Sequence, residues 1–268
     1  MQRTVTSHIV LDVAQTADLV FAIAVADAYT PASESVSATL DGASVPLRAL
    51  TDAHGGRLHR VTAGPGRLVV DYAATIDGAV PPLAIAPGDE TELLVYGRPS
   101  RYAESDALAP TAAAEFGGID DPRDVLLAVS SWVGTQLSYV SGSSLPTDGA
   151  TRTLLARRGV CRDYSHLCVA LLRALGIPAR LVAVYAPGLE PMDFHAVAEA
   201  WVDGRWNVVD ATTLAPRGTL VRIATGRDAA DTAFLNVLRG RADLVEVAVT
   251  ATADTLPTDD LDVLTSIV

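Results

Sequence analysis

The feature that most constrains the fold is a change in the spacing of apolar residues near residue 97. Before it, short apolar runs alternate with the turn sequences DG, HGG, GPG and APGDE. This pattern is typical of antiparallel strands in a sandwich or barrel. After it, apolar residues recur at helical spacing, and further strands follow. The sequence therefore predicts an α+β protein, with an N-terminal antiparallel β-sandwich-like domain over residues 1–97 and a second domain over residues 98–268.

The expected elements follow from these periodicities. Strands are expected at residues 5–13, 18–26, 35–40, 43–50, 56–62, 66–74 and 91–97. Helices follow at 106–116, 121–140, 151–159 and 161–175, with Asp120 or Asp121 as cap of the second and Pro122 in its first turn. The remaining elements are strands at 179–186, 195–202, 205–212 and 219–225, a helix at 228–238 and a strand at 242–253.

The charge and the most apolar segments bear on the class of partner. The net charge is −12, from 32 acidic and 20 basic residues, and no basic run offsets it. A field of this sign repels nucleic acid and anionic lipid. Residues 1–15 lack the apolar core of a signal peptide, and residues 19–28 are too short to cross a bilayer. We therefore expect a cytoplasmic protein that binds neither nucleic acid nor membrane; its oligomeric state stays open.

A cysteine stands at the start of the helix expected over residues 161–175, which Gly176 and Pro178 should end. Cys161 begins the apolar stripe of this helix and therefore faces inward at the end nearest solvent. The free N–H groups and positive dipole end there favour the nucleophilic thiolate. Cys168 lies two turns deeper, with its Cα about 10 Å away, so we expect two free thiols and a packing role for Cys168. Taken alone, Cys161 is equally consistent with a buried cysteine.

A hairpin provides possible partners for Cys161. Asp203 and Gly204 predict a two-residue type I′ turn, so that residues pair when their numbers sum to 407. His195 and Asp210 are then diagonal neighbours on one face, about 7 Å apart, and a carboxylate can orient an imidazole at that range. A one-residue bulge would separate them. Cysteine, base and acid in this order are the parts of a thiol nucleophile triad.

A zinc site is the alternative use of these cysteines and histidines. Zinc binding by Cys161, His166, Cys168 and His195 fails on helical geometry, because His166 lies about 140° round the helix from Cys161 and the cysteines are two turns apart. We expect no metal site. Structural or surface roles are expected for His8, His54 and His59, a buried structural role for Glu199, and helix-start positions for Asp163, Asp228 and Asp231.

Two stretches carry a resemblance to a known family. GVCRDYSHLCVALLRALGIPARLVAVY, at residues 159–185, and MDFHAVAEAWVDGRWNVVDAT, at residues 192–212, resemble the motif blocks of the bacterial transglutaminase-like family of cysteine enzymes. The similarity extends over roughly residues 1–250, more loosely in the N-terminal part. It implies a papain-like core of helices packed on an antiparallel sheet, with Cys161, His195 and Asp210 as the catalytic residues and no cofactor.

The resemblance also implies an oxyanion hole, built from the backbone N–H of Cys161 and a side chain upstream of it. Trp132, Gln136 and Tyr139 are candidates, and we prefer Tyr139 because it begins the loop YVSGSS; a packing role for Tyr139 is an equally good interpretation. The expected activity is thiol-dependent hydrolysis of peptide or protein amides through a thioester. The alternatives are transglutaminase-type acyl transfer and a binding or scaffold protein without turnover.

Overall fold

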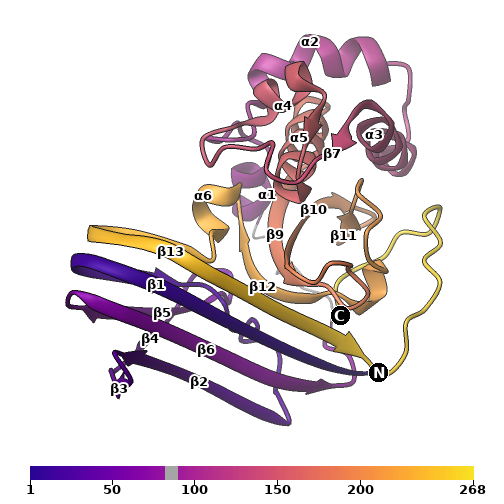
Figure 1. Ribbon diagram of the computed structural model, residues 1–268. Helices are drawn as coiled ribbons and strands as arrows, with labels where there is room; N and C mark the ends of the chain where they lie inside the picture. Colours follow the sequence, from indigo (N-terminus) through magenta and orange to yellow (C-terminus); the bar gives the residue numbers. More distant parts are fainter. Residues whose placement is uncertain (82–89) are drawn as a thin grey trace.

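The computed structural model describes residues 1–81 and 90–268, so most of the turn expected at 86–90 lies outside the described residues. Figure 1 shows three layers: a seven-stranded sheet, a four-stranded sheet and a group of helices. Both sheets are antiparallel throughout. The α+β class predicted from the sequence, with helices packed on an antiparallel sheet, is confirmed.

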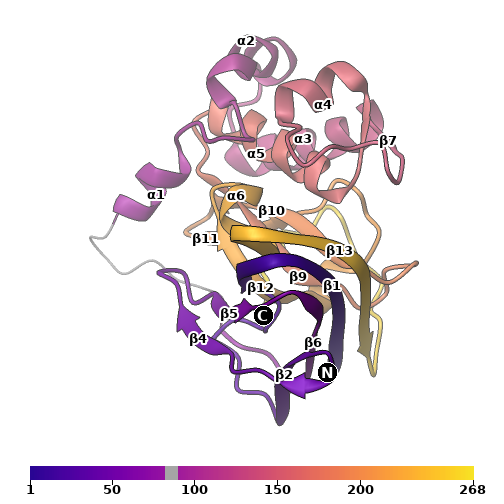
Figure 2. The ribbon, with the colours of Figure 1, turned by 60° about the vertical axis from the view of Figure 1, so that its left-hand side comes forward.

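The seven-stranded sheet joins both ends of the chain. Its N-terminal strands are β1 (Gln2–Phe21), β2 (Ser33–Leu40), β3 (Ala43–Ser44), β4 (Arg48–Thr51), β5 (Arg57–Ala63) and β6 (Gly66–Asp77), in the order β3-β2-β6-β1-β5-β4. The last strand, β13 (Leu235–Ala253), pairs with β1, and the two bend together (Figure 2). This sheet therefore contains strands from both sides of the boundary expected near residue 97. The division into two domains stays a prediction.

The four-stranded sheet carries the helices. It contains β9 (Ala179–Tyr185), β10 (Phe194–Val202), β11 (Arg205–Val209) and β12 (Val221–Gly226), in the order β11-β10-β9-β12. The helices are α1 (Thr91–Tyr96), α2 (Ser105–Phe116), α3 (Pro122–Gln136), α4 (Ala150–Ala156), α5 (Cys161–Ala174) and α6 (Ala229–Thr232), with a 3-10 turn at Arg217–Thr219. A short parallel pair, β7 (Ser138–Tyr139) and β8 (Arg158–Gly159), lies before α5.

Several predicted elements are wrong. The strand expected at 43–50 is two short strands, β3 and β4, and the helix expected at 121–140 ends at Gln136. Residues 91–96 form a helix instead of a strand, because the short run LLVY fits either structure and only Tyr96 reaches the core, where its ring meets Trp206 edge-on at 5.5 Å. Residues 235–238 form a strand instead of a helix, because they pair with the end of β1. The strands expected at 5–13 and 18–26 are one strand that ends at Phe21.

The predicted signals at the helix ends are confirmed. Asp121 caps α3 by accepting a hydrogen bond from the Arg123 N–H at 2.8 Å, and Pro122 is the first helical residue. Helix α5 ends at Ala174, and Gly176 follows with a φ of 80°, a conformation that suits glycine. Nearly all of α5 is buried, so it forms the centre of the helical layer.

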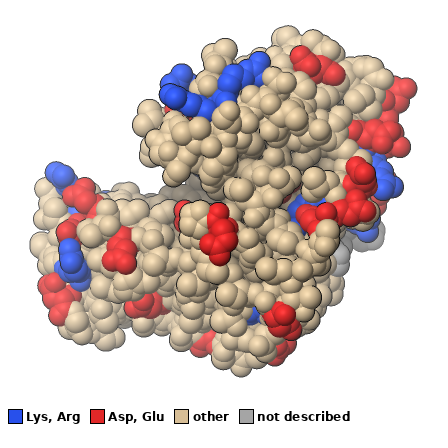
Figure 3. Space-filling model, turned by 45° about the vertical axis from the view of Figure 1, so that its right-hand side comes forward, with Lys and Arg blue, Asp and Glu red and all other residues tan. Residues whose placement is uncertain are grey.

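The four-stranded sheet is covered on both faces. Helices α2, α3 and α5 share a core with β9, β10 and β11, while Tyr185 of β9 and Val221 and Ile223 of β12 belong to the core of the seven-stranded sheet. Figure 3 shows the surface hollowed between the helices at the top and the sheets below, with few charged side chains on its visible walls. No helix among the described residues is long and apolar enough to cross a membrane.

Candidate active site

The hairpin of β10 and β11 brings His195 and Asp210 into contact. Asp203 and Gly204 have φ values of 55° and 72°, which identify the predicted type I′ turn. Ala198 faces Val209, in the predicted register, and no bulge intervenes. His195 is the second residue of β10, and Asp210 directly follows β11. The Nε2 atom of His195 therefore lies 2.8 Å from Oδ2 of Asp210.

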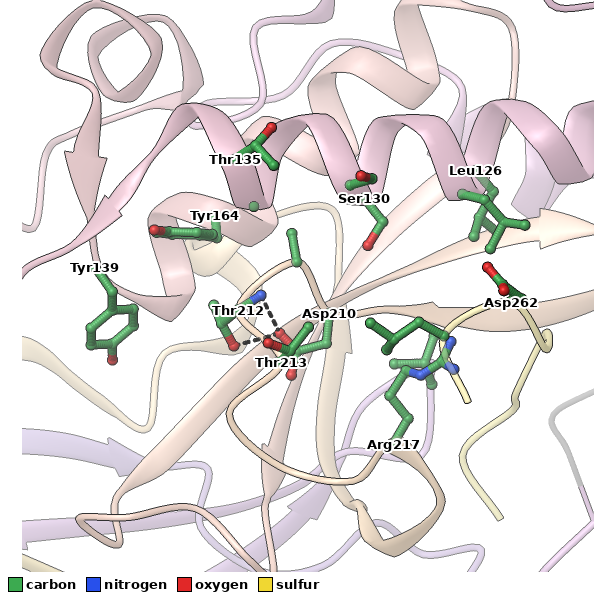
Figure 4. A pocket seen from close by; sticks show the side chains of 16 residues that line it. Leu126, Ser130, Thr135, Tyr139, Tyr164, Asp210, Thr212, Thr213, Arg217 and Asp262 are labelled. Atoms are coloured by element: carbon green, nitrogen blue, oxygen red, sulfur yellow. Dashed lines mark hydrogen bonds between the residues drawn. The ribbon is translucent and has the colours of Figure 1, made fainter. Parts of the chain in front are cut away.

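Thr212 orients the carboxylate of Asp210 through the oxygen that does not contact His195. Oδ1 accepts hydrogen bonds from the backbone N–H of Thr212 at 3.0 Å and from the Thr212 hydroxyl at 2.6 Å (Figure 4). This is an Asx turn, and the pattern Asp-x-Thr at 210–212 is a sequence signal for it. Thr212 was not predicted as a residue that orients Asp210, although this signal is present in the sequence.

Burial strengthens the interaction between the two side chains, because His195 is 2% and Asp210 is 4% exposed. Burial alone would lower the pKa of His195, but the charge of Asp210, the hydrogen bond to it and the neighbouring Cys161 thiol raise that pKa to about 10. Burial would raise the pKa of Asp210, but the charge of His195 and the bonds from His195 and Thr212 hold it below its usual value. The contact therefore favours an imidazolium on His195 beside a carboxylate on Asp210.

The start of α5 fixes the position of Cys161. The carboxylate of Asp163, predicted as a helix-start acid, accepts hydrogen bonds from the Val160 N–H and the Ser144 hydroxyl, both at 2.8 Å. Gly159 is required here, because a Cβ at this position would lie 2.6 Å from the Cβ of Asp163. Both contacts hold the turn that delivers Cys161 to the first position of the helix.

A serine ties this first turn to the strand that carries His195. The Ser165 hydroxyl lies 2.9 Å from the carbonyl oxygen of Cys161 and 2.8 Å from that of Ala196. As a result, Cys161 and His195 line the same cavity. The sequence offered no signal for this role of Ser165. The partly exposed Cys161 contrasts with Cys168, which is fully buried among apolar side chains, and both thiols are free, as predicted.

Tyr139 lies beside Cys161 because β7 pairs with β8. Tyr139 is opposite Gly159, two residues before Cys161. Burial raises the pKa of Tyr139 to about 12, and both the backbone N–H and the thiol of Cys161 are close enough to affect that pKa. Of the other two candidates, the Trp132 indole already donates to Glu115 at 3.0 Å. The Gln136 amide oxygen accepts from Arg157 at 2.8 Å, which directs that side chain toward Arg157.

His166, Asp228 and Glu199 have structural partners. His166 is buried, stacks on Tyr102 and accepts a hydrogen bond from the Ala229 N–H at 3.1 Å, and it is not among the residues that line the cavity beside Cys161. Burial lowers the pKa of His166 to about 3. Asp228 caps α6, as predicted, by accepting from the Ala230 N–H at 2.9 Å. Glu199 is the buried structural acid that the sequence predicted, because it pairs with Arg180 and Arg222.

The comparisons with known proteins extend these observations. The model of the transglutaminase-like superfamily matches residues 110–211, a range that contains Cys161, His195 and Asp210. A crystal structure from Cytophaga hutchinsonii, described as that of a candidate cysteine protease, is 32% identical, with a TM-score of 0.87 over 97% of this chain and 94% of that one. The likeness therefore includes the N-terminal sheet as well as the helical part.

Two curated relatives come from mycobacteria. An uncharacterized protein of Mycobacterium leprae is 28% identical over 159 residues, which are 55% of this chain and 57% of that protein. An uncharacterized protein of Mycobacterium tuberculosis is 35% identical over 143 residues, 47% of this chain and 45% of that protein. The matches span about half the length of these relatives. With the nearly full-length structural match, they confirm the resemblance seen in the sequence, and the chain belongs to the transglutaminase-like superfamily.

Proposed function

We propose that the protein is a thiol-dependent amide-bond hydrolase in which Cys161 is the nucleophile, His195 the proton carrier and Asp210 the acid that orients it. The observation that carries this proposal is the buried His195–Asp210 contact of 2.8 Å, beside a cavity that Cys161 also lines. The similar structure from Cytophaga hutchinsonii, described as a candidate cysteine protease, supports the same class of reaction.

Each proposed role follows from the atom that is available. Asp210 occupies Nε2 of His195, so Nδ1 is the nitrogen left to exchange a proton with the Cys161 thiol. The raised pKa of His195 favours the protonated imidazole, which is the form that can give a proton to the leaving group. The backbone N–H of Cys161 and the Tyr139 hydroxyl are the proposed donors to the oxyanion.

The proposed reaction has two steps. The Cys161 thiolate forms a bond to the amide carbonyl carbon, the C–N bond breaks, and His195 gives its proton to the departing amine nitrogen. A thioester remains. His195 then takes a proton from water, the resulting hydroxide attacks the thioester, and the C–S bond breaks. The products are a carboxylic acid and the regenerated Cys161 thiolate.

A second cavity supports water as the acceptor. It has a volume of about 410 Å³, and Tyr139, Asp210 and Thr212 line it (Figure 4). Ser130, Ser131, Thr135 and Thr213 add hydroxyl groups to its lining, and the apolar part of the lining includes Leu126, Leu127, Val208 and Leu261. A transferase must keep water from the thioester. A cavity with several hydroxyl groups beside the proposed oxyanion donor can hold water there, which favours hydrolysis.

The first prediction concerns the identity of the nucleophile. Iodoacetamide at neutral pH is expected to label Cys161 at least about 100-fold faster than Cys168 in the folded protein. Burial raises the pKa of the Cys168 thiol and excludes the reagent from it, whereas Cys161 borders a cavity. Mass spectrometry of peptides after timed labelling measures both rates, and unfolded protein gives the control in which the rates converge. Equal labelling in the folded state would remove Cys161 from its proposed role.

The second prediction concerns the acceptor. Protein incubated with a glutamine-containing peptide library and a labelled primary amine is expected to release mainly free acids, with amine-linked products in the minority. Mass spectrometry counts both kinds of product, and a Cys161→Ala variant gives the background. A majority of amine-linked product would replace hydrolysis by acyl transfer and leave the triad in place. Absence of both products across the library would favour a binding protein without turnover.

A further inference from the structure

The cavity beside Cys161 and His195 has a largely apolar lining, which the proposed chemistry of these two residues does not need. Its volume is about 570 Å³, within the range of pockets that bind small ligands or single side chains. Strands β9, β10 and β12 form one part of the wall, and α6 with the start of β13 forms another. The start of α5, with Ala22, Tyr102 and Pro146, completes it. The seven-stranded sheet therefore contributes to the surroundings of Cys161 through Leu235 and Asn236, and Phe234 directly precedes its strand β13.

The walls of this cavity are largely apolar. Leu181 and Ile223 are buried in the wall, and the rings of Phe194 and Phe234 stack with their centres 5.2 Å apart. Small residues leave the space between these groups open, namely Ala22, Ala183, Ala196, Ala229, Ala230 and Ala233. Phe194 and Phe234 are only partly buried, so their rings remain available to a further apolar group.

Several polar groups of this cavity already have partners. The Asp193 carboxylate accepts from the Phe194 N–H at 2.7 Å, and Arg162 directs Nη2 to the Ser144 hydroxyl at 2.6 Å and to the carbonyl oxygen of Leu145 at 2.8 Å. The Asn236 side chain donates to the carbonyl oxygen of Ala233. A charged or amide side chain that entered between the phenylalanines would lose its hydration without gaining equivalent hydrogen bonds.

We propose that this cavity binds a large apolar side chain, of the size of leucine or phenylalanine, next to the amide bond that Cys161 attacks. The inference rests on the proposed function, and it names the class of substrate: polypeptides with a leucine, methionine or aromatic residue flanking the scissile bond. Burial of such a side chain against the two rings contributes binding energy roughly in proportion to its apolar area. Glutamine, aspartate and lysine at the same position bind less well.

The test compares two alkylating reagents, iodoacetamide and N-phenethyl-iodoacetamide, on Cys161. Each rate is divided by the rate with free cysteine in solution, which removes the intrinsic reactivity of the reagents. The phenethyl reagent is expected to label Cys161 about 10-fold or more faster than iodoacetamide, because its ring enters the cavity. Peptide mapping by mass spectrometry reports the labelled residue.

Two variants should change this ratio, and one should not. Ala230→Phe fills the cavity from α6, and Phe234→Ala removes one of its aromatic walls, so both should bring the ratio to within about three-fold of one. Ala114→Phe makes the same change as Ala230→Phe on an exposed position of α2, outside the cavity, and should keep the wild-type ratio. Circular dichroism confirms that each variant is folded before its ratio is used.

The outcomes separate this inference from the proposed function. A ratio near one in the wild-type protein, with Cys161 still labelled much faster than Cys168, overturns the apolar cavity as a binding site and leaves the nucleophile in place. A high ratio that Ala230→Phe does not change overturns it as well, because the reagent then binds elsewhere. Equal iodoacetamide labelling of Cys161 and Cys168 removes the proposed function on which the inference rests.

Discussion

Replacing Asp210 by asparagine is expected to lower kcat about 10⁴-fold and to leave the fold intact. The asparagine keeps an oxygen that can accept from Thr212, as Oδ1 of Asp210 does at 3.0 Å and 2.6 Å. Its NH₂ group then faces Nε2 of His195, where Oδ2 now lies at 2.8 Å. An NH₂ donor stabilises the tautomer that carries its proton on Nδ1, so Nδ1 can no longer accept a proton from the Cys161 thiol.

The measurement is kcat on a peptide substrate, together with the imidazole titration of His195 by NMR. Because the charge of Asp210 raises the pKa of His195 to about 10, loss of that charge should move the pKa of His195 down, toward or below its ordinary value. A matched control is Asp71→Asn. Oδ1 of Asp71 lies 2.6 Å from Nδ1 of His8, and this second His–Asp pair is exposed on the N-terminal sheet. This control should keep full activity. An unchanged kcat in Asp210→Asn would exclude Asp210 from the site.

The parts of the site that the sequence predicted are those with local signals. Asp203 and Gly204 specify a turn whose geometry sets the register of the hairpin, and the register brings His195 and Asp210 together. The apolar stripe and the glycine at 176 specify α5 and hence the position of Cys161 at its start. Each of these signals spans fewer than about 20 residues, so no distant part of the chain was needed to interpret it.

The parts that the sequence did not predict depend on distant contacts. Residues 235–238 have helical spacing, but they form a strand because they pair with the end of β1, which lies more than 200 residues earlier in the sequence. That pairing places Phe234 and Leu235 in the wall of the cavity beside Cys161, so this side of the site could not be foreseen. The role of Ser165 could not be predicted from the sequence either, because its partner Ala196 lies on another element.

The buried ion network on β10 should dominate the stability of the sheet that carries His195. Glu199 is fully buried, and its carboxylate accepts from Arg180 at 2.8 Å and from Arg222 at 2.6 Å. Replacing Glu199 by glutamine leaves both guanidinium groups buried with one negative partner fewer. We expect a loss of about 3 to 5 kcal/mol in the free energy of unfolding, measured by urea denaturation.

A neighbouring acid provides the control. Glu92 of α1 also pairs with Arg180 at 2.8 Å, but its side chain is 30% exposed, so Glu92→Gln should cost about 1 kcal/mol or less. The pH dependence gives a second check. Burial would raise the pKa of Glu199, but the charges of Arg222 and Arg180 lower it to about 2, from 4.5. Because the pKa of Glu199 is lower in the folded state, its ionised carboxylate contributes to the free energy of unfolding in full above about pH 4.5. This contribution disappears as the pH falls toward 2.

The difference in unfolding free energy between the wild-type protein and Glu199→Gln should therefore be largest at neutral pH and should shrink below about pH 4.5. Titration of the other groups affects both proteins alike and cancels in this difference. A glutamine variant as stable as Glu92→Gln at neutral pH would mean that the two arginines find other partners or water. In that case Glu199 would not hold β9, β10 and β12 together, and the rigidity of the strand that presents His195 would have to come from its apolar contacts alone.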